Sequence, residues 1–213
     1  MILSLSDRAD SLTPSLIYSH RWLYHGVMRL LYGRHFGARY AAIAAEIPSG
    51  ASVVDVCAGD GYLYLRYLRR KAVPYVGLDI SAGLVDWAQR HGVPVRQFDA
   101  RQDELPIGDV VIMQASLYQF LPCADEMLRK LLAAARQKVV ITEPIRNMAA
   151  SSNPLLALVG RRATVPAGAA YVAQRFNAQT LSALFHSFDA FERSALLPGG
   201  REMLGVFAGR CRS

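Results

Sequence analysis

Three aspartates stand at the ends of three apolar segments of this chain: Asp55, Asp79 and Asp99. A loop with two glycines, Gly59 and Gly61, follows the first of them, and a helical pattern starts at once. A buried strand, a tight turn and a helix N-terminus can hold a nucleotide-like ligand against backbone N–H groups. An acid at the end of the second strand can accept both hydroxyls of a ribose. Because parallel strands end at one edge of a sheet, the three acids predict a ligand site at that edge.

The spacing of the glycines helps to decide which kind of nucleotide-like ligand the loop can bind. The dinucleotide fingerprint needs a third small residue, but this chain has Tyr64 there, or Tyr62 if Cys57 opens the motif. The loop also lacks the Gly-Lys-Ser/Thr of a phosphate-binding P-loop. Gly59-x-Gly61 alone would also suit an ordinary turn. With Asp79 and Asp99 in register, a cofactor with a ribose and an adenine but no pyrophosphate fits better.

Strands and helices that position these residues alternate along the chain. Helices are expected over 14–32, 36–46, 61–71, 81–91 (with Ser81 as N-cap), 123–137 and 177–187. Strands are expected from Val53 onward and over 75–78, 93–98, 109–114, 138–142, 187–196 and 203–208. The last two flank the turn Pro198–Gly200 and form a hairpin, which puts an antiparallel strand into an otherwise parallel sheet. The pattern predicts an α/β fold with a doubly wound, mostly parallel seven-stranded sheet closed by this hairpin.

The segment Asp55-Val56-Cys57-Ala58-Gly59-Asp60-Gly61 resembles the first motif of the class I S-adenosylmethionine-dependent methyltransferases, acid-x-Gly-x-Gly-x-Gly. Cys57 replaces the first glycine, a mild departure. The resemblance extends from about Ser49 to Arg210 and is strongest up to Gln114. It implies a Rossmann-like methyltransferase fold, S-adenosyl-L-methionine as the cofactor and S-adenosyl-L-homocysteine as its product.

Roles for particular residues follow from the same resemblance. It implies that Asp55, Gly59 and Gly61 surround the methionine part of the cofactor. Asp79 would hold the ribose, and Asp99 with the Ala100 N–H would meet the adenine. The full implied cofactor set is Asp55, Cys57, Ala58, Gly59, Gly61, Asp79, Ile80, Asp99, Ala100 and Gln114.

We expect a single domain over residues 1–213, with an N-terminal helical cap (1–48), a cofactor-binding half (49–144), a lid insertion (145–176) and a C-terminal helix and hairpin (177–213). Tyr18 and Trp22 lie on one face of the first helix and either roof the active site or pack against another helix or subunit. The insertion carries an apolar run and Arg161, which would either contact an acidic acceptor or face solvent.

Methyl transfer from a sulfonium is an in-line displacement that asks the protein mainly to align the acceptor and exclude water. Many such enzymes need no essential base. If the acceptor is a hydroxyl or an acidic carbon, the candidate bases are His25, Glu143 and His20, with Tyr118 as an orienting donor.

Composition limits the partners. The 213 residues carry 24 Lys and Arg against 17 Asp and Glu, a net charge of +7, so a nucleic-acid substrate has to be weighed. The basic clusters lie away from the expected active edge, and the motif that grips a flipped base is missing. Three scattered cysteines indicate a reducing compartment without a metal site. No apolar run is long enough for a membrane span, and no signal peptide is apparent, so a cytoplasmic protein is expected.

The sequence therefore predicts a methyltransferase that acts on a small, apolar or aromatic acceptor, as a monomer or homodimer. An RNA or protein methyltransferase is the first alternative. A cofactor-binding module without transfer, or a cyclase assisted by S-adenosylmethionine, is the alternative from another class.

Overall fold

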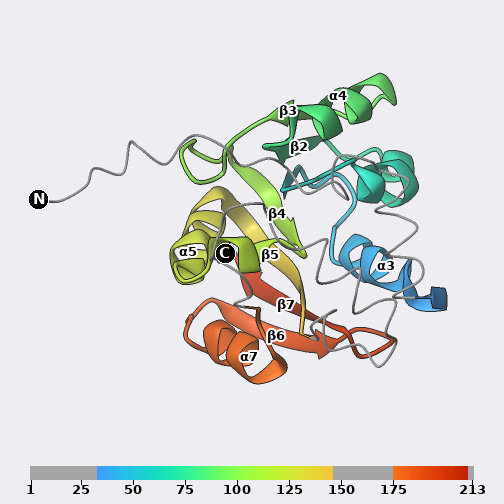
Figure 1. Ribbon diagram of the computed structural model, residues 1–213. Helices are drawn as coiled ribbons and strands as arrows, with labels where there is room; N and C mark the ends of the chain where they lie inside the picture. Colours follow the sequence, from blue (N-terminus) through green and yellow to red (C-terminus); the bar gives the residue numbers. More distant parts are fainter. Residues whose placement is uncertain (1–32, 146–174, 211–213) are drawn as a thin grey trace, which may run out of the picture.

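Seven strands form one mixed sheet with helices on both faces (Figure 1). The computed structural model describes residues 33–145 and 175–210. The strand order is β3-β2-β1-β4-β5-β7-β6, and only β7 runs against the other six. The strands are β1 (Val53–Val56), β2 (Tyr75–Asp79), β3 (Val95–Gln97), β4 (Gly108–Gln114), β5 (Ala135–Pro144), β6 (Phe191–Leu196) and β7 (Glu202–Ala208). The predicted doubly wound sheet with its closing hairpin is confirmed, whereas the predicted helix 14–32 lies outside the described residues.

Helices connect the strands and cover the sheet. They are η2 (Gly33–His35), α3 (Ala38–Ala45), a π-helical turn η3 (Tyr64–Leu68), η4 (Arg69–Lys71), α4 (Ala82–Arg90), η5 (Leu117–Phe120), α5 (Ala124–Ala134) and α7 (Ala178–His186). Ser81 occupies the N-cap position of α4, but its side chain makes no capping bond. Helix α7 begins with a capping box, in which Asn177 accepts a hydrogen bond from the Thr180 N–H at 2.8 Å.

Several predicted boundaries were wrong, and the strand expected over 138–142 runs from Ala135 to Pro144. The helix expected over 123–137 ends at Ala134, because Ala135 already pairs with Gly108 of β4. The strand expected over 187–196 begins only at Phe191, after a turn in which the Phe191 N–H bonds to Phe188 O. The strand expected over 93–98 shortens to Val95–Gln97. For the helix and for the strand that begins at Phe191, backbone pairing decides where the element ends or begins, whereas Pro94 and Phe98, on either side of Val95–Gln97, still form backbone hydrogen bonds with β2.

The core is divided by the sheet into two layers, because successive strand residues face opposite sides. On one side, Val54, Val56, Val111 and Met113 pack with side chains of α5 and α7, including Leu128, Leu131, Leu181 and Phe185. On the other side, Val53, Val110, Ile112 and Val140 pack with Ile43 of α3 and with Leu63 and Leu68 around η3. The central strands are therefore apolar on both faces, as expected for buried parallel strands.

A buried ion pair joins helix α3 to the last strand, β7. Arg39 Nη1 of α3 lies 2.8 Å from Glu202 Oε1 of β7, and both side chains are almost fully buried. Arg39 Nη2 also donates to Tyr40 Oη at 2.6 Å. This pair fixes α3 against the sheet, since removing either partner would leave a buried charge uncompensated.

Two features are absent from the described residues. No helix in the described part of the chain has the length and apolar character needed to cross a membrane. Within residues 33–145 and 175–210, no group of three or more His, Cys, Asp or Glu side chains is arranged to hold a metal ion. The thiols of Cys57 and Cys123 are free.

Candidate functional site

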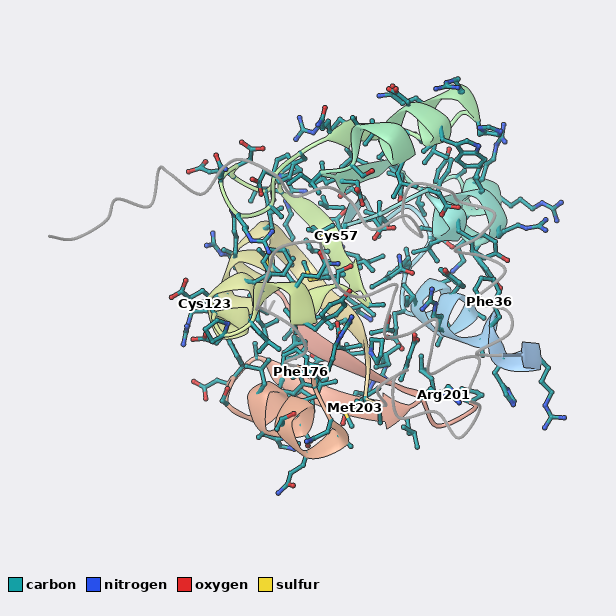
Figure 2. All side chains as sticks on the ribbon, in the orientation of Figure 1. Phe36, Cys57, Cys123, Phe176, Arg201 and Met203 are labelled. Carbon is teal, nitrogen blue, oxygen red and sulfur yellow. The ribbon has the colours of Figure 1, made fainter. Side chains whose placement is uncertain are left out.

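The loop after β1 turns sharply through residues with positive φ: Cys57 (60°), Gly59 (60°) and Gly61 (67°). A Cβ on Gly61 would lie 2.6 Å from Cγ1 of Val93, so packing requires this glycine. A Cβ on Gly59 would meet nothing within 4 Å. Gly61 therefore holds the loop against the protein, while Gly59 leaves open space above it. Cys57, at the start of the loop, lies near the middle of the molecule (Figure 2).

Asp79, at the end of β2, is hydrogen-bonded to this loop. Its Oδ2 accepts the Gly59 N–H at 2.8 Å, and its Oδ1 accepts the Ser81 N–H at 2.9 Å. Burial raises the pKa of Asp79, and the two backbone donors act in the opposite direction. Each carboxylate oxygen has a further lone pair for a ligand hydroxyl. The neighbouring Ile80 is 55% exposed, an apolar surface next to an acidic one.

Asp55 is fully buried behind the loop. Tyr75 Oη donates to its carboxylate at 2.9 Å, and Gln114 Nε2 lies 3.2 Å from each carboxylate oxygen. Burial raises the pKa of Asp55 to about 7. The Gln114 Oε1 atom is buried and has no hydrogen-bond partner. Asp55 thus orients Gln114 at the end of β4, and the Oε1 atom of Gln114 remains able to accept a hydrogen bond from a ligand.

Asp99 and Ala100 follow β3 in a tight turn. Asp99 Oδ1 accepts the Arg101 N–H at 2.9 Å, and its Oδ2 accepts Gln102 Nε2 at 3.0 Å. The Ala100 carbonyl accepts Lys130 Nζ at 2.8 Å. Among the residues that the structure describes, none accepts a hydrogen bond from the Ala100 N–H. The turn therefore presents one backbone donor at this edge.

Two of the three non-glycine residues with positive φ in the described part of the chain lie at the same edge. Cys57 and Ala115, at the ends of β1 and β4, have backbone φ values of 60° and 48°. Residues other than glycine rarely adopt such positive φ values. This conformation explains why the family motif has glycine where this chain has Cys57. Burial, with the nearby Asp79 charge, raises the pKa of the Cys57 thiol to about 12, so the thiol stays neutral.

Glu143 and Tyr118 lie at the ends of β5 and β4. The Leu117 N–H donates to Glu143 Oε2 at 2.8 Å, so this carboxyl holds the start of η5. Glu143 is 1% exposed, and burial raises its pKa to about 8. Tyr118, carried by η5, stacks under the guanidinium of Arg175, whose Cζ is 3.3 Å from the ring centroid.

The described structure brings most of the predicted site residues to one edge of the sheet. The implied cofactor set surrounds the ends of β1, β2, β3 and β4, and Tyr118 and Glu143 continue the edge beyond it. Tyr18, His20, Trp22, His25 and Arg161 lie outside the described residues. Arg175 was not predicted. Nothing in the sequence distinguishes it, because its contact with Tyr118 joins two residues that are far apart in the chain.

The groups left unfilled at this edge match the parts of S-adenosylmethionine. Gln114 Oε1 is a buried acceptor suited to an ammonium group, and the Ala100 N–H is a donor suited to a ring nitrogen. The open space above Gly59 and the exposed Ile80 allow close approach of backbone and ring. The residues present therefore fit this cofactor.

Comparisons with solved structures agree with this fold. A magnesium protoporphyrin IX methyltransferase from Synechocystis PCC 6803 with bound SAH is 17% identical and has a TM-score of 0.62, covering 87% of this chain and 87% of its own. A possible histamine N-methyltransferase from Thermotoga maritima is 14% identical with a TM-score of 0.64, covering 91% of this chain and 98% of its own. No curated protein matches the chain.

A third solved structure is the complex between the Haloferax volcanii Trm112 methyltransferase activator and a methyltransferase. It is 15% identical with a TM-score of 0.63 and covers 92% of this chain and 98% of its own. The family described as a methyltransferase domain matches residues 28–190, most of the sequence. With the motif, the strand order and the site in agreement, the chain belongs to the class I S-adenosylmethionine-dependent methyltransferases.

Proposed function

We propose that this methyltransferase acts on a small, apolar or aromatic acceptor that binds beside Tyr118. The observation that carries the proposal is the position of Tyr118. It lies in η5, directly after β4, and is only partly buried, next to the edge that carries the cofactor residues. Phe120 and Leu121 follow it and also pack only partly into the core. Arg175 covers one face of the Tyr118 ring and Arg101 lies over Phe120, so a flat or apolar partner would contact the parts of these side chains that the two arginines leave exposed.

In this proposal each cofactor residue has a distinct task. Asp79 binds the ribose hydroxyls while it holds Gly59 and Ser81 in place. The Ala100 N–H and Ile80 contact the adenine, and Gln114 Oε1 accepts from the methionine ammonium. Asp55 acts indirectly, because its carboxylate is fully buried and faces Tyr75 and Gln114.

When bound, S-adenosylmethionine supplies a methyl group activated by its sulfonium. The protein contributes alignment and exclusion of water. Glu143 is a positioning residue in this proposal: it is buried, accepts the Leu117 N–H and so sets the orientation of η5 and of Tyr118. With its pKa raised to about 8, Glu143 is mostly protonated at neutral pH, and its ionised fraction stays a candidate base.

Macromolecular acceptors are the competing class. The Haloferax methyltransferase seen with Trm112 has a TM-score similar to those of the other two structures, and the net charge of +7 would suit a nucleic acid. The partly exposed aromatic surface favours a small acceptor over this alternative.

The test begins with calorimetric titration of the protein with S-adenosylmethionine, S-adenosylhomocysteine and NADH. We expect micromolar binding of the two sulfur compounds, no binding of NADH, and loss of binding in Asp79→Ala. Release of S-adenosylhomocysteine is then followed with small aromatic acceptors, transfer RNA and protein. Turnover with small molecules supports the proposal, and turnover with RNA or protein alone overturns it. Binding without turnover of any acceptor would favour the non-transferring module or the cyclase.

A further inference from the structure

We propose that Arg175 binds a carboxylate group of the acceptor, so that the substrate is an apolar or aromatic acid. This inference rests on the proposed function, since it concerns the same acceptor site.

The orientation of Arg175 is fixed by aromatic stacking. Its Cζ lies 3.3 Å from the centre of the Tyr118 ring, the contact distance of two flat groups lying face to face. The ring is itself positioned, because Glu143 holds the N–H of the preceding Leu117. A guanidinium lying flat on an aromatic ring points its N–H groups outward in the plane of the ring, where they can meet a planar carboxylate with two parallel bonds.

The donors of Arg175 are not used elsewhere in the described structure. Within residues 33–145 and 175–210, no group accepts a hydrogen bond from its guanidinium and no carboxylate forms an ion pair with it. The side chain is nevertheless partly buried. A guanidinium has five N–H donors, and leaving them partly desolvated without a partner is unfavourable. A bound anion would supply the partner.

The charges nearby favour a single negative charge on that anion. Arg39 and Glu202 pair with each other at 2.8 Å and cancel. Burial raises the pKa of Glu143 to about 8 and the nearby charge of Arg175 lowers it, so the mostly protonated carboxyl balances only part of that charge at neutral pH. A single cation matches the single charge of a carboxylate.

The experiment compares two probes of the same shape, benzoate and benzamide, on the protein saturated with S-adenosylhomocysteine. The variants are Arg175→Gln, Arg175→Lys and the control Arg129→Gln, which removes an exposed arginine paired with Asp125 on α5. We expect the unmodified protein and Arg129→Gln to bind benzoate about tenfold more tightly than benzamide. Arg175→Gln should lose this preference, and Arg175→Lys should keep only part of it, because an ammonium cannot pair with two parallel bonds.

The methionine carboxylate of the cofactor is a second possible partner of Arg175, so the cofactor arm is measured separately. We expect Arg175→Gln to leave the affinity for S-adenosylhomocysteine and for 5′-methylthioadenosine unchanged. If only the first affinity falls, Arg175 holds the cofactor and the inference is wrong. A benzoate preference that is absent from the unmodified protein, or that survives in Arg175→Gln, also overturns it. Failure of the unmodified protein to bind S-adenosylhomocysteine would refute the proposed function instead.

Discussion

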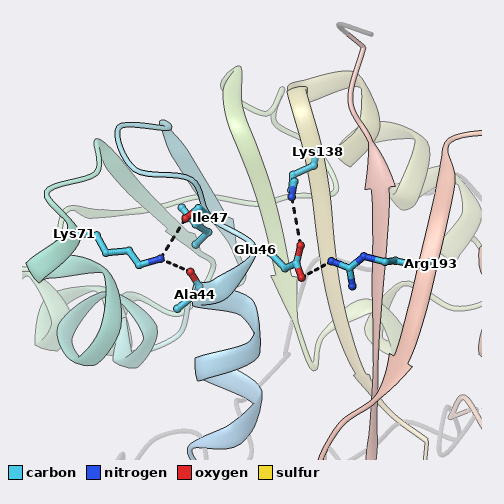
Figure 3. Close-up of polar contacts among 6 residues, drawn as sticks. All are labelled: Ala44, Glu46, Ile47, Lys71, Lys138 and Arg193. Carbon is cyan, nitrogen blue, oxygen red and sulfur yellow. Dashed lines mark hydrogen bonds and ion pairs between the residues drawn. The ribbon is translucent and has the colours of Figure 1, made fainter. Parts of the chain in front are cut away.

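Acidic residues differ between the two ends of the parallel strands: the amino edge, where these strands begin, and the carboxyl edge, where they end and the cofactor residues lie. At the amino edge, Glu46 pairs with Lys138 and Arg193 (Figure 3). Burial alone would raise the pKa of Glu46, but the two cations lower it overall. Asp109, at the start of β4, has a lowered pKa because it accepts from the Ser52 N–H and hydroxyl at 2.8 and 2.7 Å. These acids are charged and satisfied by the protein.

At the carboxyl edge, the acids lie where burial is the dominant influence. The pKa of Asp55 rises to about 7 and that of Glu143 to about 8. Their neighbours include strained backbone at Cys57 and Ala115 and the unfilled acceptor of Gln114. One edge is therefore built for stability, and the other gives up stability at positions where a ligand is expected.

The largest expected effect separates the two glycines of the carboxyl edge. Gly61→Ala should destabilise the protein by about 3 kcal/mol, because the new methyl group would clash with Val93 and the backbone has φ +67°. Gly59→Ala should cost only about 1 kcal/mol of stability but weaken S-adenosylhomocysteine binding about tenfold, since its methyl group enters the open space. Urea unfolding and calorimetry measure the two quantities, and equal stability losses would refute the distinction.

A second expected effect is a stability that falls as pH rises. The folded protein holds the protons of Asp55 and Glu143 more tightly than the unfolded chain, in which their pKa values are near 3.8 and 4.5. Their contribution is complete below those values and is lost as the pH rises to about 7 and about 8. Glu143→Gln should remove about half of the pH dependence of the free energy of unfolding, because it removes one of two similar groups. Chemical denaturation at several pH values between 5 and 8 tests it. An unchanged slope would contradict the assignment.

The amino edge should respond with a smaller effect and the opposite sign. Glu46→Gln should cost about 1 kcal/mol at neutral pH, because it weakens the contacts with Lys138 and Arg193. Its lowered pKa means that the contribution is present above the unfolded value and lost as the pH falls toward the folded one. Binding of S-adenosylhomocysteine to the folded variant should not change. A weaker affinity would show that the edges are coupled.

The smallest expected effect concerns the strained residue of the motif. Cys57→Gly should stabilise the protein by about 0.5 kcal/mol, because relief of the positive φ slightly exceeds the greater chain entropy of glycine. Cys57→Val should destabilise it, since a branched side chain tolerates this backbone poorly. Thermal unfolding of the three proteins ranks them, and a Cys57→Val variant as stable as the unmodified protein would contradict the strain.

The sequence predicted the sheet because its strand signals are local. The apolar runs ending in Asp55 and Asp79 and the turn Pro198–Gly200 are each complete within a few residues. Helix α5 was predicted too long, because the alanines at its end suit a helix and only pairing with Gly108 makes Ala135 a strand residue. Arg175 was missed because its stacking on Tyr118 joins residues that are far apart in the chain.

The position of β7 has a consequence for how the chain folds during synthesis. On the ribosome β6 is made before β7, yet β7 is the strand that joins β6 to β5. The side of β5 that pairs with β7 therefore stays unpaired until almost all of the described chain has been translated. Arg39 also lacks its ion-pair partner Glu202 up to that point. Until then, an incomplete nascent chain exposes a strand edge to other chains, so a chaperone that covers this edge would protect it.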